Sequence, residues 1–145
     1  MTNTIDPNRI LLVEDDPNDV ELIQLSLESY NFVNQIDVVT DGAQALAYLQ
    51  GQAHNPVSHP LPRLVLLDLK LPKVSGIEVL RAIRADPRTR ELVVVVMTSS
   101  AEGKDLRACY ELGVNSYIVK PLDFPQFKEV ARQIGFYWMM LNQIP

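Results

Sequence analysis

The chain has 145 residues, 47% of them hydrophobic, and no low-complexity tract, so a single packed domain over residues 1–145 is expected. A net charge of −5 without any basic run disfavours binding to nucleic acid or to an anionic membrane surface. The single cysteine cannot form an internal disulfide, and neither a signal peptide nor an apolar run of the roughly 20 residues that span a bilayer is recognised, so a cytoplasmic location is expected.

Strand and helix signals alternate from the start of the chain. The apolar run Ile10–Val13 predicts a strand, and Asp16 with the proline after it predicts the start of a helix that has Asp19 in its first turn. Ile36–Val39 predicts the second strand. Gly51–Pro62, which holds three prolines and both histidines, predicts a surface loop. These histidines have no cysteine or paired acidic motif beside them, so a metal site is not expected there.

The second half continues the alternation. Leu64–Leu67, Leu92–Met97 and Tyr117–Val119 predict three more strands. Ser75 begins a capping box at the start of the third helix, and Gly113 stands where the fourth helix should end. Five strands with helices between them predict an α/β fold, in which a parallel sheet with right-handed crossovers has helices on both faces.

A terminal helix is predicted over about residues 124–143. A stripe at helical spacing predicts its buried face: Phe127, Val130, Ala131, Ile134, Trp138 and Leu141. Phe136, Met139 and Met140 fall outside the stripe, and with Tyr137 they predict an exposed apolar surface. We expect a homodimer built partly from residues 134–144, with the histidine domain of the kinase as a competing occupant of the nearby surface. The alternative is that the 51–62 loop or the chain end covers the exposed apolar residues. Gly135 would permit a break in the helix.

Polar residues directly follow four of the predicted strands: Glu14 and Asp15, Asp68, Thr98, and Lys120. Because the carboxyl ends of parallel strands form the ligand crevice of such a sheet, these side chains are expected to meet at one edge. The three acidic groups would repel one another there, and a divalent cation resolves the repulsion. Oxygen ligands with positions left for water favour Mg²⁺. The lysine offers a counter-charge suited to a phosphoryl oxygen, and the threonine offers a hydroxyl donor.

Over about residues 8–130 the chain resembles the CheY-like receiver domains of response regulators. The matching segments are Ile10–Asp16, Leu66–Pro72, Gly76, Val95–Ser99 and Tyr117–Pro121. The resemblance implies a flavodoxin-like, doubly wound five-stranded parallel sheet in the order 2-1-3-4-5. It also implies a phosphoprotein of a two-component phosphorelay, not an enzyme that acts on a foreign substrate.

The resemblance implies a role for each residue of the set. Asp68 is the phosphoacceptor, served by a sensor histidine kinase. Mg²⁺ is held by Glu14, Asp15, Asp68 and the backbone carbonyl of Lys70. Thr98 and Lys120 contact the phosphoryl group, and Tyr117 turns inward on activation.

More narrowly, the chain resembles the small receivers that are paired with cyanobacterial phytochromes. This resemblance rests on Glu14, on the proline-rich loop over residues 55–62 and on the aromatic end Phe136–Trp138. No output domain is recognised, so output is expected to run through a protein partner or through feedback on the kinase. Lys70 stands where a smaller polar side chain would be unremarkable, and we expect it to alter the phosphate lifetime in a direction that the sequence does not give.

Three other interpretations fit the sequence less well. Phosphoaspartate hydrolases carry an Asp-x-Asp motif at the nucleophile, in which the second carboxylate acts as acid and base. In this chain the corresponding second position is Lys70. A flavodoxin-like flavin binder needs a phosphate loop after the first strand, where Glu14 and Asp15 would repel a phosphate. A receiver that signals by binding alone is disfavoured by the intact set of site residues.

Overall fold

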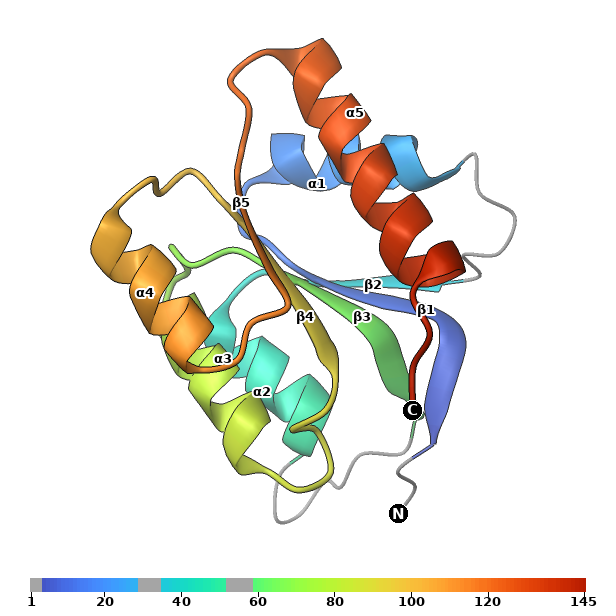
Figure 1. The fold of residues 1–145 in the computed structure, drawn as a ribbon, viewed down its shortest axis with the longest axis vertical. Coiled ribbons are helices and arrows are strands. Elements are labelled where there is room, and N and C mark those ends of the chain that lie inside the picture. The colour runs from blue at the N-terminus through green and yellow to red at the C-terminus, as the bar shows by residue number, and fades with distance from the viewer. Residues whose placement is uncertain (1–3, 29–34, 52–58) are drawn as a thin grey trace.

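The computed structural model describes residues 4–28, 35–51 and 59–145. Strands and helices alternate along the chain (Figure 1), as follows: β1 Ile5–Val13, α1 Pro17–Glu28, β2 Gln35–Val39, α2 Gly42–Gln50, β3 Leu61–Leu67, α3 Gly76–Ala85, β4 Val93–Thr98, α4 Gly103–Glu111, β5 Ser116–Val119, α5 Phe124–Gly135 and the π-helix η1 Phe136–Leu141. Within these ranges, none of the helices combines the length and the apolar character needed to cross a bilayer.

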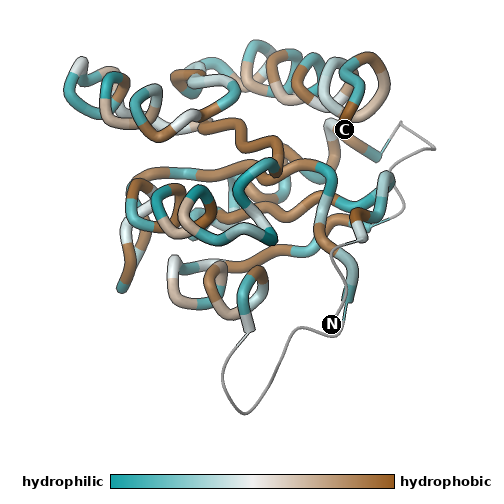
Figure 2. The backbone as a smooth tube through the Cα atoms, turned by 60° about the horizontal axis from the view of Figure 1, so that its bottom comes forward, coloured by the Kyte–Doolittle hydropathy of each residue, from teal (hydrophilic) through white to brown (hydrophobic). Residues whose placement is uncertain are grey.

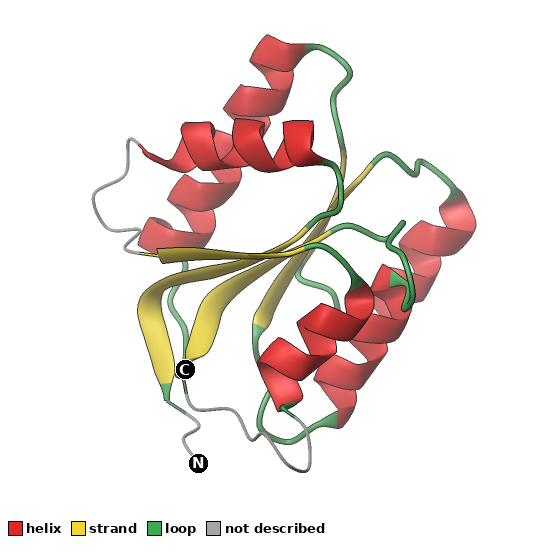
Figure 3. Ribbon diagram, turned by 180° about the vertical axis from the view of Figure 1, so that it is seen from behind, coloured by secondary structure: helices red, strands yellow, loops and turns green. Residues whose placement is uncertain are grey.

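The five strands form one parallel sheet in the order β2-β1-β3-β4-β5. Helices α1 and α5 cover one face, and α2, α3 and α4 cover the other (Figures 1 and 3). The expected α/β fold, with this strand order and helices on both faces, is therefore confirmed.

The sheet has a hydrophobic core on each face because successive side chains of a strand point in opposite directions. On β1, Leu11 and Val13 join the core beneath α2–α4, whereas Ile10 and Leu12 join the core beneath α1 and α5. Strands β3 and β4 divide their side chains in the same way. Over residues 10–13, 64–67 and 93–97 the central strands are consequently apolar on both faces, and they lie between the two helical layers (Figure 2).

The first and third strands begin earlier than predicted. Ile5 pairs with Leu61, and the Leu61 amide donates to the Thr4 carbonyl at 2.9 Å. Leu61 is fully buried, so the predicted surface loop is wrong at residues 61–62, where pairing with β1 extends the strand. Most of that loop, including His54, lies outside the described residues. His59 packs its ring against Tyr48, with centroids 4.2 Å apart.

The predicted helix signals are confirmed. The Asp16 carboxylate accepts the Asn18 amide hydrogen at 2.9 Å, and α1 begins at the next residue after Asp16. The Ser75 hydroxyl accepts from the Glu78 amide at 3.3 Å and caps α3. Gly113 has a φ of 79°, a left-handed conformation that ends the helical run of α4.

The terminal helix changes its hydrogen-bond pattern at Phe136, and this change overturns part of the predicted burial pattern. In a π-helix the bonds join residues five apart instead of four. Met139, five residues after Ile134, is therefore buried in the core, whereas Leu141 is 54% exposed. The placement of Met139 on the exposed surface was wrong for this reason. The break at Gly135 does not occur, since its φ of −59° and ψ of −47° are helical.

Arg63 of β3 holds the end of η1 against the sheet. Its Nε donates to the Trp138 carbonyl at 3.2 Å, and its Nη2 donates to the Asn142 carbonyl at 2.6 Å. The last carbonyls of a helix lack partners within the helix, so this guanidinium satisfies them. Ile144 packs on the core beyond this anchor.

Arg63→Ala should lower the free energy of unfolding by about 2 kcal/mol, because two hydrogen bonds from a charged donor are lost. Amide exchange in residues 136–142 should accelerate more than exchange in β3. Arg81→Ala, at an exposed position of α3, is the matched control and should change neither quantity. Unaltered exchange over residues 136–142 in Arg63→Ala would show that the segment does not depend on this anchor.

Candidate functional site

The carboxyl edge of the sheet gathers the polar residues that follow the strands. Ligand oxygens of Glu14, Asp15 and Asp68 all lie within 4.8 Å of one another. Glu14 and Asp68 are buried, and Asp15 is exposed. Strands β1 and β3 bring them together, since Val13 pairs with Leu67 and the Asp68 amide donates to the Val13 carbonyl at 3.0 Å.

Lys120, at the end of β5, places its ammonium in this acidic cluster. The Nζ donates to three carboxylates: Glu14 Oε1 at 2.6 Å, Asp19 Oδ2 at 2.8 Å and Asp68 Oδ2 at 2.9 Å. The lysine side chain is 10% exposed, so these charged hydrogen bonds form largely out of water. The predicted counter-charge is thus in direct contact with the predicted acceptor.

Asp19 was not expected in the site. The helix dipole favours an acidic residue in the first turn of a helix, so nothing in the sequence required a role for Asp19 in the site. The direction of the side chain could have indicated its place in the site. Helical side chains lean toward the helix N-terminus, and α1 begins directly after the acidic residues that follow β1. An acidic side chain in that turn therefore points back to the sheet edge.

Backbone packing fixes the position of Asp68. Its Oδ1 accepts the Leu69 amide hydrogen at 2.7 Å and the Lys70 amide hydrogen at 3.4 Å. The backbone of Gly76 lies so close that a Cβ there would be 2.2 Å from the Asp68 carbonyl oxygen. A glycine is required at this position because any side chain would displace the loop that carries Asp68.

Burial and neighbouring charges raise the pKa values of two groups, Glu14 and Lys120, so both favour their protonated forms. Burial raises the pKa of Glu14 to about 7, an effect that the Lys120 hydrogen bond reduces and the Asp68 charge increases. Burial alone would lower the pKa of Lys120, but the hydrogen bonds that its ammonium donates to Asp19, Glu14 and Asp68 outweigh burial and raise that pKa. The site thus has a charged ammonium and too little positive charge for its carboxylates.

This donor set fits a divalent cation. Three carboxylates from two strand ends offer hard oxygen ligands within one coordination sphere, and a single ammonium does not neutralise them. Burial is the main cause of the raised pKa of Glu14, and the neighbouring Asp68 charge adds to it, as expected where carboxylates are crowded.

Hydrogen bonds connect the other expected residues to this edge. The Lys120 amide donates to the Thr98 carbonyl at 2.7 Å. The Thr98 hydroxyl is fully buried and accepts the Ser100 amide hydrogen at 3.3 Å. The Tyr117 hydroxyl donates to the Ser100 carbonyl at 2.9 Å. Lys70, by contrast, is exposed.

Comparison with known sequences gives a family match over most of the chain. Residues 10–132 match the family described as the response regulator receiver domain. The chain is 44% identical over 140 residues to "Probable methanogenesis regulatory protein FilR2" of Methanothrix harundinacea, covering 97% of this chain and 89% of that protein. It is 37% identical over 139 residues to response regulator Rcp1 of Synechocystis sp., covering 96% and 94%.

Two solved structures are similar over nearly their whole length. The phosphorylated cyanobacterial phytochrome response regulator RcpA matches with a TM-score of 0.90 and 36% identity, over 95% of this chain and 98% of RcpA. The Mn²⁺-bound form of Rcp1 matches with a TM-score of 0.89 and 36% identity, over 96% and 99%.

Glu14 should make the metal-free protein less stable as the pH rises from about 4.5 to 7. Its pKa in the folded state is about 7, against an ordinary value of 4.5, so the folded protein keeps a proton that the unfolded chain releases. Below pH 4.5 both states are protonated and the penalty is absent; above pH 7 it is complete, on the order of 3 kcal/mol.

Urea unfolding in the presence of a chelator, from pH 4.5 to 8, measures this penalty as the difference between the wild type and Glu14→Gln. The amide keeps an oxygen for Lys120 but does not titrate, so the variant should gain stability over the wild type as the pH rises. A difference that stays constant over this range would contradict the assignment.

Proposed function

The chain belongs to the response regulator receiver domain family, and on that premise we propose that it is a phosphorylation switch whose phosphoacceptor is Asp68. One observation carries the proposal: the buried Asp68 carboxylate accepts a hydrogen bond from the Lys120 ammonium beside two further carboxylates. A nucleophile, a counter-charge and a cation site therefore share one edge of the sheet.

The reaction moves a phosphoryl group from a phosphohistidine to the Asp68 carboxylate. The P–N bond to the imidazole breaks and a P–O bond to a carboxylate oxygen forms. Such a transfer needs positioning and charge neutralisation more than covalent assistance. Asp68 is held by backbone amides at Oδ1, and Lys120 donates at Oδ2, where it can follow the charge onto a phosphoryl oxygen.

We assign the cation as Mg²⁺, held by Glu14, Asp15, Asp68 and the backbone carbonyl of Lys70. When bound, Mg²⁺ supplies neutralisation of the phosphoryl oxygens. The family resemblance, the oxygen-only donor set and the Mn²⁺-bound structure of Rcp1 support this assignment.

Phosphorylation would act on the protein surface through Thr98 and Tyr117. A phosphoryl dianion beside Asp68 attracts the Thr98 hydroxyl, which now accepts from the Ser100 amide. Movement of this segment changes the packing of Tyr117, which is bonded to the Ser100 carbonyl. The surface formed by α4, β5 and α5 then presents different groups to a partner.

The phosphoryl donor in this proposal is a sensor histidine kinase of the phytochrome type, in the cytoplasm. The similarity to RcpA, a cyanobacterial phytochrome response regulator, supports this choice. An activity on a foreign phosphate ester is not favoured, because the second carboxylate of the phosphoaspartate hydrolases is replaced by Lys70. The chain catalyses only its own phosphorylation and dephosphorylation.

Asp68→Asn should abolish labelling by acetyl phosphate with Mg²⁺ or by the cognate kinase, because the amide is not a nucleophile. Circular dichroism should remain that of the wild type. Asp86→Asn, in the turn after α3, is the matched control and should be labelled normally. Labelling of a folded Asp68→Asn protein at the wild-type rate would refute the acceptor assignment.

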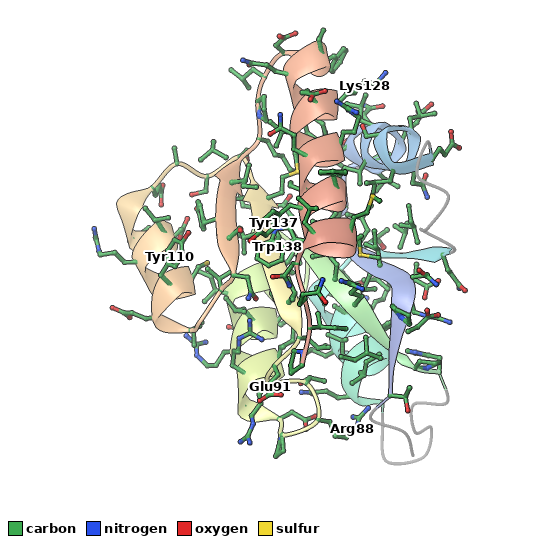
Figure 4. All side chains as sticks on the ribbon, turned by 45° about the vertical axis from the view of Figure 1, so that its right-hand side comes forward. Arg88, Glu91, Tyr110, Lys128, Tyr137 and Trp138 are labelled. Atoms are coloured by element: carbon green, nitrogen blue, oxygen red, sulfur yellow. The ribbon has the colours of Figure 1, made fainter. Side chains whose placement is uncertain are left out.

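We also propose that the chain forms a homodimer through its C-terminal surface, defined by Phe136, Tyr137 and Met140. These side chains are 42%, 49% and 48% exposed. The adjoining Leu141 adds apolar area, and a groove of about 460 Å³ between β5 and the last turns of the helix has Tyr137 and Trp138 on its wall (Figure 4). Clustered aromatic and methionine side chains suit a protein interface.

The double variant Phe136→Ser/Met140→Ser should be monomeric at tens of micromolar in sedimentation, because the apolar area that drives association is lost. Its labelling at Asp68 should be unchanged. Tyr110→Ser removes an equally exposed aromatic residue of α4 and should leave the dimer intact. A monomeric wild type, with or without phosphorylation, would rule out this dimer.

A further inference from the structure

We propose that Asp19 is a positioning residue for phosphoryl transfer, which orients the Lys120 ammonium so that one N–H points at Asp68. This inference rests on the proposed function of Asp68 as the acceptor. It concerns a residue outside the carboxylate cluster of Glu14, Asp15 and Asp68. Asp19 would act through the lysine and would not itself contact the phosphoryl group.

The geometry of the ammonium carries the proposal. A lysine ammonium has three N–H donors, and here each has a carboxylate partner on a different element: Glu14 after β1, Asp19 in α1 and Asp68 after β3. With all three donors engaged, rotation about the last bond of the side chain is fixed. The N–H directed at Asp68 Oδ2 then stays where a phosphoryl oxygen must be neutralised.

Asp19 differs from the other two partners in what else it can bind. Glu14 and Asp68 belong to the carboxylate cluster that fits a divalent cation, and a cation there competes with the lysine for their charge. Asp19 is outside that cluster, so its charge remains available to Lys120 whether or not the cation is bound. The Asp19 side chain is also only 20% exposed, so its charged hydrogen bond to Lys120 forms partly out of water.

Loss of the Asp19 charge should therefore affect turnover and not the affinity for the donor. A long lysine side chain released from one anchor regains rotamer freedom that must be lost again in the transition state. For Asp19→Asn we expect the maximal rate of labelling by acetyl phosphate to fall about tenfold, with the half-saturating concentration of acetyl phosphate unchanged. Mg²⁺ affinity, measured by isothermal titration, should change less than about twofold.

Asp16→Asn is the matched control. It makes the same chemical change beside the same helix start, and the Asp16 carboxylate caps α1, whereas the Lys120 ammonium donates to Glu14, Asp19 and Asp68. If Asp16→Asn slows labelling as much as Asp19→Asn, the effect is a general loss of negative charge and the proposal is overturned. Wild-type kinetics in Asp19→Asn overturn it directly.

A double-mutant cycle tests whether Asp19 acts through the lysine. In a Lys120→Ala background, Asp19→Asn should cause no further loss, whereas independent effects would multiply and refute the proposal. The ammonium protons of Lys120 give a second readout by NMR, since their exchange with water should be slow in the wild type and faster in Asp19→Asn. Unaltered exchange would overturn the proposal even if Lys120→Ala labels too slowly for kinetics.

Asp68→Asn separates this test from that of the acceptor. If Asp68→Asn is still labelled, the proposed function fails and the kinetic effect of Asp19 has another origin. If Asp68→Asn is inert and Asp19→Asn behaves as the wild type, the acceptor assignment stands and only the positioning role is lost.

Discussion

The ion cluster around the Lys120 ammonium is the constraint on which the rest of the molecule depends. Four carboxylates converge on one edge of the sheet, and one lysine donates hydrogen bonds to three of them. Burying such a set costs free energy, as the raised pKa of Glu14 indicates. A fold can hold it only where the backbone leaves no room for the carboxylates to separate, and the two central strands provide that rigidity.

The two-sided core explains why the edge is rigid. Strands β1 and β3 lie in the middle of the sheet, and their side chains enter both cores. Displacing Asp68 would require moving close-packed residues on both faces. The tight approach of Gly76 to the Asp68 carbonyl adds a second restraint from α3. The favourable free energy of packing the core thus offsets the unfavourable free energy of the crowded site. Such an offset is common where function needs strain or charge.

Local patterns were sufficient to predict much of this molecule from the sequence. Continuous apolar runs predicted the central strands, and polar residues after those runs predicted the carboxylate cluster and the lysine. Asp19 was missed because the helix dipole already accounted for an acidic residue in the first turn of α1. Leu61 and Met139 were misplaced because long-range pairing with β1 and the five-residue spacing of a π-helix decide their burial. Neither effect appears in the local pattern of the chain.

Strand β5 is the shortest structural connection between the ion cluster and the C-terminal surface. Lys120 and Tyr117 connect this strand to the ion cluster and to the loop after β4. Ile118 points to the opposite face, where it lines the groove against Trp138 and the last turns of the helix. Because β5 is a four-residue edge strand paired on one side by β4, its displacement disturbs fewer hydrogen bonds than that of a central strand. A change at Tyr117 can therefore reach the C-terminal surface through one short element, while the central sheet that holds Asp68 stays fixed.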